Sequence, residues 1–144
     1  MRAFGGLAIS VRLAAEELLS EFSARLDEGR ADTVHELFVE NGCIVTPQFT
    51  LANREEIRRR FTDRARDTRR RTRHYWSNAR FSGDETEITV VTNVMTAIAV
   101  DGEPTIVMGG TSADVIVPAN GGWAFRSRTL EVSFEGILPP VAAP

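Results

Sequence analysis

Lysine is absent from this chain, and all 17 basic residues are arginine. A Schiff-base mechanism and a lysine general base are therefore excluded. Cysteine is nearly absent too: Cys43 is the only one, so neither an intrachain disulfide nor a cysteine-based zinc site can form. With only two histidines, His35 and His74, a zinc site would also need several carboxylates. We expect no metal and no cofactor.

Long apolar runs and an excess of positive charge are also missing. No apolar run approaches the length of a membrane helix, and the short, glycine-broken stretch at the N-terminus is not a signal-peptide core. The net charge is −3 and the isoelectric point about 5.4, which argues against a dedicated nucleic-acid or anionic-membrane binder. The single cysteine fits a reducing compartment. We expect a soluble, cytoplasmic protein, and the arginine bias is typical of a GC-rich bacterial genome.

The length of 144 residues favours one domain, large enough to bury roughly two-thirds of the surface of its unfolded chain. We expect that domain at 13–136, after a loose N-terminal arm at 1–12 and before a proline-containing tail at 137–144.

Apolar residues at helical spacing mark the first half of the chain. One helix is predicted over 13–27, ended by Gly29, and a short second helix follows the N-cap residue Asp32. A third helix is predicted over 54–67, with Asn53 as its N-cap.

The segment between the second and third helices contains a turn signal and a short strand pattern. Asn41-Gly42 indicates a turn, and residues 43–46 indicate a strand that Pro47 stops.

From about residue 72 the apolar period changes from helical to two, which is typical of strands. Asp101-Gly102 and Asn120-Gly121 are hairpin signals between the β-rich runs. Three helices followed by a meander predict an α+β fold, in which a cone-shaped, curved antiparallel sheet packs on the helices. The open mouth of such a cone is a natural pocket for a small molecule. The predicted strands are 74–81, 87–100, 103–117 and 123–134.

The first of these strands carries the candidate base. Strand alternation puts His74, Trp76 and Asn78 on one face, which combines an imidazole, an aromatic surface and an amide. An imidazole acts best as a general base when a carboxylate fixes its tautomer. Asp27, at the end of the first helix, and Asp114, on the third long strand, are the two candidate partners. A purely structural role for His74 is the alternative.

Several other strand residues are candidates for the cavity wall. Asn93 and Met95 share one face of the second long strand, and we expect both of them, and Asp114 on the third, to contact substrate. Arg128 and Glu131 lie on opposite faces of the last strand, so only one of them can face the pocket. Trp123 is interpreted as a core residue.

Residues 54–73 hold ten arginines against four acidic residues. This segment is interpreted as an anion or RNA patch, a solvated helix face, or a subunit contact. Arg71 or Arg73 near the mouth of the cone would steer an acidic substrate. Aromatic residues are scarce within the run, so we expect no nucleic-acid partner.

Five segments together carry a family resemblance: Phe22–Phe38, Arg54-Glu55-Glu56-Ile57, Thr72-Arg73-His74, Met108-Gly109-Gly110-Thr111 and Gly121–Arg128. They resemble SnoaL-like proteins of the nuclear transport factor 2-like superfamily, whose members adopt a cone-shaped, cystatin-like roll. The resemblance covers about residues 13–135. The third and fourth long strands are most similar to the hexachlorocyclohexane dehydrochlorinase and scytalone dehydratase group.

In that group an aspartate on the first helix and a histidine on the first long strand form a catalytic dyad, and Asp27 and His74 fall on those positions. The resemblance implies that His74 abstracts a proton while Asp27 orients it. Loss of a leaving group, a double-bond shift or ring closure would follow. Scytalone dehydratase also uses tyrosines and a second histidine, whereas this chain has Phe22 on the first helix and no histidine on the third long strand. A dehydratase of that kind is therefore not expected.

Two functional hypotheses follow. The first is a cofactor-independent lyase or isomerase acting on a small, largely apolar molecule, with Asn78 as a polar contact and Phe22 and Trp76 packing on the substrate. The second is a non-catalytic binding or assembly module, like the small subunit of a ring-hydroxylating dioxygenase.

We also expect a homodimer or homotrimer that forms through the outer face of the sheet. That face is predicted to carry Tyr75, Phe81, Val90, Val94 and Val107.

Overall fold

The computed structural model describes residues 6–139. Its helices are α1 (Ile9–Asp27), the 3-10 helix η1 (Ala31–Leu37) and α2 (Arg54–Arg66). Its strands are β1 (Phe38–Val45), β2 (Thr50–Leu51), β3 (Arg70–Gly83), β4 (Ile88–Val100), β5 (Thr105–Ala119) and β6 (Gly122–Leu138).

The predicted arm and tail lie partly outside the described residues, at 1–5 and 140–144. Within the described part, α1 begins at Ile9 and β6 continues to Leu138, so regular structure extends beyond both predicted boundaries. None of the helices among residues 6–139 is long and apolar enough to cross a membrane.

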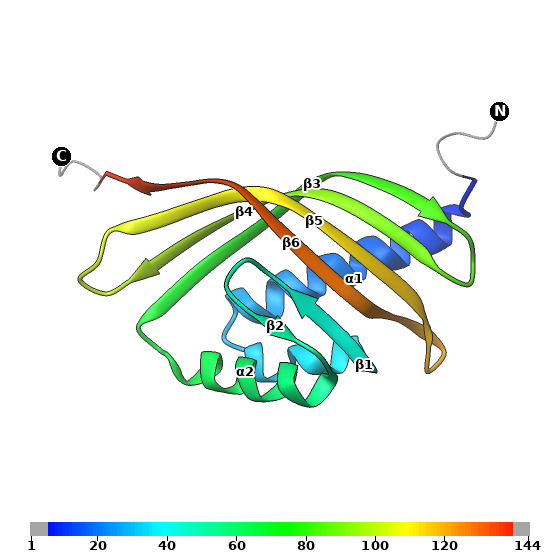
Figure 1. Cartoon of the computed structure of the whole chain (residues 1–144), viewed down its shortest axis with the longest axis horizontal. Coiled ribbons are helices and arrows are strands. Elements are labelled where there is room, and N and C mark those ends of the chain that lie inside the picture. The colour runs from blue at the N-terminus through cyan, green and yellow to red at the C-terminus, as the bar shows by residue number, and fades with distance from the viewer. Residues whose placement is uncertain (1–5, 140–144) are drawn as a thin grey trace.

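The sheet is a single curved layer of six strands in the order β2-β1-β6-β5-β4-β3 (Figure 1). Neighbouring strands are antiparallel except for β1 and β6, which run parallel. The predicted meander of four long strands is confirmed, and the three helices with a curved sheet confirm the α+β class. The sheet is mixed, not purely antiparallel as predicted, because β1 pairs with β6 in parallel, and it is unclosed. Local sequence patterns do not reveal this pairing, since it joins segments far apart in the chain.

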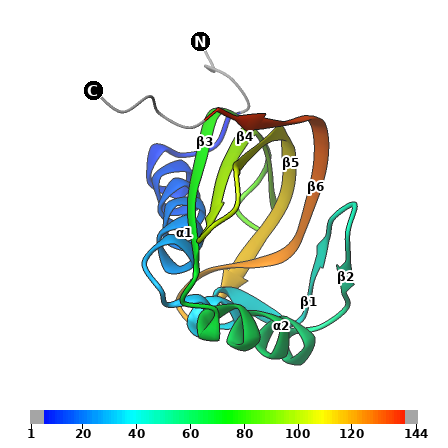
Figure 2. The same ribbon diagram turned by 90° about the vertical axis from the view of Figure 1, so that its left-hand side faces the viewer.

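The helices close one side of this sheet and leave a hollow beneath it. In Figure 2, α1 lies beside β3, and α2 runs below the sheet between β3 and the β1–β2 pair. The core between the three helices and the sheet is apolar and fully buried at Leu19, Val34, Ile57, Ile116 and Phe125. Burial of this apolar face fixes α1 against β3, and so determines what the C-terminal end of α1 meets.

Helix α2 begins where the sequence predicts. The Asn53 side chain accepts a hydrogen bond from the Glu56 N–H at 3.0 Å, and the Glu56 carboxylate accepts one from the Ala52 N–H at 2.7 Å. These bonds satisfy backbone donors at the helix start. Arg54 also donates to the His35 carbonyl at 3.1 Å, which ties α2 to η1.

The turn predicted at Asn41-Gly42 is wrong, because both residues lie inside β1. The pairing of β1 with β6 shifts register between Phe38 and Cys43, so the dipeptide accommodates an irregularity in a strand. Gly42 is required there, since a Cβ at this position would lie 2.9 Å from the Val39 carbonyl oxygen.

The predicted outer face of the sheet is partly wrong. Tyr75 is 60% exposed there, but Val90 is fully buried and Val94 lines the inner hollow. Phe81 packs against the core because a bulge in β3, between Ser77 and Arg80, reverses the direction of the side chains that follow it.

A cross-strand row of residues instead marks the outer face. Tyr75 pairs with Met95, Met95 with Gly109, and Gly109 with Phe134, and the three large side chains of this row are exposed. Self-association through this face stays a prediction.

Candidate functional site

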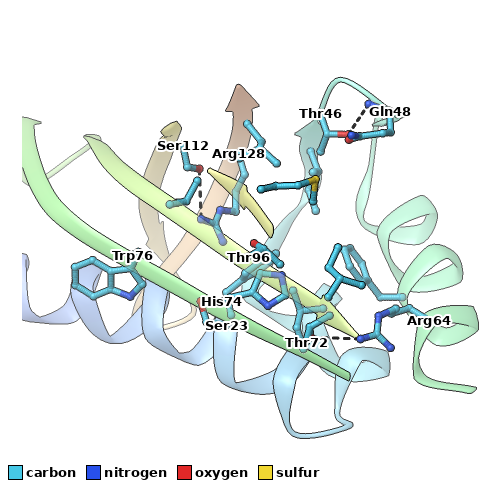
Figure 3. A pocket seen from close by; sticks show the side chains of 18 of the residues that line it. Ser23, Thr46, Gln48, Arg64, Thr72, His74, Trp76, Thr96, Ser112 and Arg128 are labelled. Atoms are coloured by element: carbon cyan, nitrogen blue, oxygen red, sulfur yellow. Dashed lines mark hydrogen bonds between the residues drawn. The ribbon is translucent and has the colours of Figure 1, made fainter. Parts of the chain in front are cut away.

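A cavity of about 400 Å³ lies in the hollow between the sheet, α1, α2 and the β1–β2 hairpin. This volume lies within the range of small-molecule sites, about 300–1,000 Å³. Figure 3 shows the polar side chains that reach it, with the His74 imidazole drawn between Arg128 and Arg64. Most of the wall is apolar and includes Phe22, Phe49, Phe61, Ile98, Met108 and Leu130.

His74 reaches the cavity from β3, whose side chains at 70, 72, 74 and 76 all line it. Its Nδ1 lies 2.6 Å from Oδ1 of Asp27, the last residue of α1. The two side chains are 24% and 11% exposed, so the contact is largely shielded from water. The pair joins residues 47 positions apart in the chain.

Both oxygens of the Asp27 carboxylate are held in place. Oδ1 also accepts a hydrogen bond from the Thr72 hydroxyl at 2.8 Å, and Oδ2 accepts one from the His74 backbone N–H at 2.8 Å. Arg73 donates to the Asp27 carbonyl oxygen at 3.3 Å. These contacts fix the end of α1 to β3 and set the orientation of the imidazole.

The same contacts determine the charge of the carboxylate. Burial would raise the pKa of Asp27, but the hydrogen bonds from the His74 side chain, the His74 backbone and Thr72 outweigh it. The pKa of Asp27 therefore lies below its ordinary value, and the carboxylate is ionised at neutral pH.

An ionised carboxylate can only accept hydrogen bonds, so Nδ1 of a neutral His74 carries the hydrogen and Nε2 carries the lone pair. Nε2 makes no hydrogen bond within residues 6–139. The imidazole lines the cavity, and this geometry leaves it able to accept a proton from a molecule bound there.

Arg128 is a cavity residue whose role sequence reasoning did not identify. Its Nε and Nη2 bond the two carboxylate oxygens of Asp114 at 2.9 and 3.0 Å, and Nη2 also contacts the Ser112 hydroxyl at 3.4 Å. The guanidinium lies over the rings of Phe22 and Phe125, at 4.1 and 4.7 Å from their centroids. Within the described chain Nη1 makes no hydrogen bond, so one donor group of a firmly held cation remains available to the cavity.

A signal for this pair was present in the sequence. Asp114 and Arg128 carry opposite charges on inward-facing positions of two consecutive strands, and the register places them directly opposite each other. Asp114 is completely buried behind Arg128 and does not line the cavity, so it is not the partner of His74, and the expected contact with substrate is wrong. Glu131 is exposed, so of the pair Arg128 and Glu131 it is Arg128 that faces the cavity.

The structure places the other predicted site residues in two groups. Phe22 and Trp76 line the cavity beside His74. Asn78, Asn93 and Met95 are exposed and do not line it. Asn78 sits at the β3 bulge with a φ of 55°, and the inward face of β4 is the one that carries Val94. The expected orientation of these three side chains is therefore wrong.

The arginine-rich segment contributes to the cavity in an unexpected way. Arg71 and Arg73 are exposed and do not line it, whereas Arg60, Arg64 and Arg70 do.

Among residues 6–139, no cluster of three or more histidine, cysteine or acidic side chains is arranged to hold a metal ion.

Comparisons with known proteins agree with this architecture. Residues 8–129 match the family model of the SnoaL-like domain, while no curated protein matches the chain. A provisionally named scytalone dehydratase from Novosphingobium aromaticivorans is 25% identical, with a TM-score of 0.80 over 92% of this chain and 90% of its own.

Two further solved structures share the fold. A type 2 hexachlorocyclohexane dehydrochlorinase (LinA) is 16% identical, with a TM-score of 0.81 over 94% of this chain and 95% of its own. An NTF2-like protein with a cystatin-like fold from N. aromaticivorans is 18% identical, with a TM-score of 0.69 over 87% of this chain and 83% of its own. The predicted resemblance and fold class are confirmed.

Proposed function

Because the chain belongs to the SnoaL-like family, we propose that it is a cofactor-independent lyase or isomerase that removes a proton from carbon in a small organic substrate. The observation that carries this proposal is the 2.6 Å contact between His74 Nδ1 and the Asp27 carboxylate at the wall of an apolar cavity. An imidazole oriented by a carboxylate, with its other nitrogen free, is a general base.

In the proposed reaction, Nε2 of His74 takes the proton from a substrate carbon and the ring becomes an imidazolium. The ionised Asp27 carboxylate stabilises that positive charge. In an elimination, the electron pair of the broken C–H bond forms the new C=C bond, and the leaving group departs with its own electron pair. In an isomerisation, the imidazolium returns the proton to a different carbon of the same substrate.

Arg128 is proposed to stabilise the negative charge that develops on the leaving group or on a substrate oxygen. Its contacts with Asp114 and Ser112 hold the guanidinium in place before substrate binds. Fixed donors in an apolar site stabilise a charged transition state without first having to reorient. Phe22 and Trp76 would pack on the apolar part of the substrate.

The test is proton exchange in D2O with a panel of small apolar ketones and of β-hydroxy and β-chloro carbonyl compounds, followed by NMR and mass spectrometry. The wild-type protein should exchange or eliminate at least one class. His74→Gln should lower that rate by about 100- to 10,000-fold, as for loss of a general base. The matched control is His35→Gln, which alters the only other histidine, outside the cavity.

An unchanged rate in His74→Gln would contradict the proposal. Binding of panel members without exchange or elimination would favour the alternative, a non-catalytic ligand-binding module. The open cavity fits either outcome, whereas the free Nε2 of an imidazole held by a largely shielded carboxylate favours catalysis.

A further inference from the structure

The end of the cavity beside α2 concentrates positive charge that the proposed proton transfer does not use. Arg60 and Arg64 project into it from α2, and Arg70 enters it from the start of β3. Arg60 lies over the Phe49 ring at 4.3 Å, and Arg64 contacts the Thr72 hydroxyl at 3.4 Å (Figure 3). Three guanidinium groups thus share one wall of an otherwise mostly apolar space.

Arg60 and Arg64 differ from their neighbours on the same helix. Arg58, Arg59 and Arg66 form ion pairs with Glu55 or Asp63. By contrast, none of the three cavity arginines forms an ion pair within the described part of the chain. Among the arginines of α2, the two that form no ion pair within residues 6–139 are therefore the two that line the cavity.

Arg70 is the least satisfied of the three. Its Nε is buried and has no hydrogen-bond partner. Burial, followed by the nearby charge of Arg64, lowers the pKa of Arg70. A buried donor without a partner is costly, and a bound anion would satisfy it.

We propose that Arg60, Arg64 and Arg70 bind a carboxylate of the substrate, so that the substrate is an organic acid with an apolar body. This inference rests on the proposed function, in which the cavity is the substrate site. Guanidinium groups bind carboxylates through paired, charge-assisted hydrogen bonds, which are stronger in an apolar surrounding than in water. The aliphatic and aromatic remainder of the wall would hold the rest of the molecule.

The geometry also restricts where the carboxylate lies relative to the reacting carbon. Inward-facing residues of a strand are spaced by about 6.5–7 Å, so Arg70, Thr72 and His74 succeed one another along the cavity floor. Arg64 contacts Thr72, and Thr72 in turn contacts the carboxylate partner of His74. The bound carboxylate would therefore lie at the Arg70 end of this row, and the reacting carbon at the His74 end.

The experiment measures displacement of the neutral fluorescent probe N-phenyl-1-naphthylamine by octanoate, 1-octanol and octyl phosphate. Octanoate should bind the wild-type protein at least about tenfold more tightly than 1-octanol, because it adds charge-assisted hydrogen bonds. Arg64→Gln and Arg70→Gln should each reduce this ratio about tenfold and leave 1-octanol binding unchanged. The matched control is Arg59→Gln, which removes one charge from the same helix outside the cavity and should keep the ratio.

Equal binding of octanoate and 1-octanol, or a loss of the ratio in Arg59→Gln, would overturn the proposal. Tighter binding of octyl phosphate than of octanoate would overturn the choice of a carboxylate. Circular dichroism checks that each variant is folded. If the half-buried Arg70→Gln does not fold, Arg64→Gln alone decides the matter.

The anion site and the catalytic proposal can fail separately. His74→Gln should keep the octanoate preference even where exchange activity is lost, because the imidazole does not contact the proposed anion. If His74-dependent exchange is observed without any octanoate preference, the anion site is refuted and the general base stands.

Discussion

The most informative substitution in the site is Asp27→Asn, which keeps the shape of the side chain and removes its charge. Asp27 accepts three hydrogen bonds, from the Thr72 hydroxyl and from the backbone N–H and Nδ1 of His74. An asparagine has one acceptor oxygen and presents an NH2 group in place of the other. At least one of the three donors must then lose its partner, or Nδ1 must become an acceptor facing the NH2 group.

Either outcome weakens the proposed base, because the imidazolium loses the carboxylate charge that stabilises it. If Nδ1 accepts a hydrogen bond, the hydrogen of the neutral ring moves to Nε2, and the lone pair no longer faces the cavity. We therefore expect Asp27→Asn to lower the exchange rate by about 100- to 10,000-fold, similar to His74→Gln. The assay is the D2O exchange experiment with whichever substrate class the wild-type protein turns over.

The substitution should also affect stability in a pH-dependent way. Hydrogen bonds to charged groups contribute about 1.5–3 kcal/mol each, so we expect a loss of about 2 kcal/mol near neutral pH. For a chain of this length that corresponds to a fall in melting temperature of about 4–8 °C.

The folded-state pKa of Asp27 is depressed. Its stabilising contribution is therefore fully present above the unfolded-state pKa, about 4, and is lost as the pH falls through the folded-state pKa. The stability difference between wild type and Asp27→Asn should thus be largest near neutral pH and shrink below about pH 4.

Asp84→Asn is the control for this series. Asp84 is also a carboxylate with a lowered pKa, chiefly because the Thr86 hydroxyl donates to it, but it caps an exposed hairpin outside the cavity. It should leave the exchange rate unchanged. Full activity in Asp27→Asn, or a stability difference that does not vary with pH, would refute the reasoning.

Three further changes test other parts of the structure. Asp114→Asn leaves the largely buried Arg128 without its counter-charge and should destabilise the fold by about 3–5 kcal/mol, measured by thermal unfolding; an unchanged melting temperature would contradict this. Gly110→Ala should unfold the protein or sharply lower its melting temperature, because the added methyl group would collide with a backbone carbonyl of β6; wild-type stability would show that this close approach is not required. Tyr75→Arg combined with Met95→Arg should convert an oligomer to a monomer by light scattering, because both side chains belong to the exposed apolar row; a monomeric wild-type protein would rule out this assembly.

Much of the fold was predictable from local patterns. The period-two segments and their glycine-containing turns located the four long strands, and Asn53 located the start of α2. The contact between Asp27 and His74 was expected through a family resemblance, and the structure shows the two side chains hydrogen-bonded.

The errors have a common physical cause, which is that alternation along a strand does not reveal where the strand bulges or which face is inward. The β3 bulge turns Asn78 outward and Phe81 inward, although an uninterrupted alternation predicts the reverse. On β4, Asn93 and Met95 share a face, as expected, but packing against the helices makes it the outer one. Register and bulges depend on pairing between distant segments, which one sequence does not specify locally.

The arginines of α2 likewise show that a local sequence pattern does not reveal which side chains face a cavity. A charged helix face is usually solvated, and only the tertiary packing distinguishes Arg60 and Arg64 from Arg58 and Arg59. The part of the charged surface of α2 that carries Arg60 and Arg64 lines the cavity.

The tautomer of His74 is the most direct test of the central claim. The chain has only two histidines, so nitrogen-15 NMR of the imidazole rings gives two sets of signals, and His74→Gln assigns them. At mildly alkaline pH the structure predicts that His74 carries its hydrogen on Nδ1, directed at Asp27, and has an unprotonated Nε2 facing the cavity. A neutral ring with its hydrogen on Nε2 would contradict the account, because the nitrogen assigned to proton abstraction would already hold a proton.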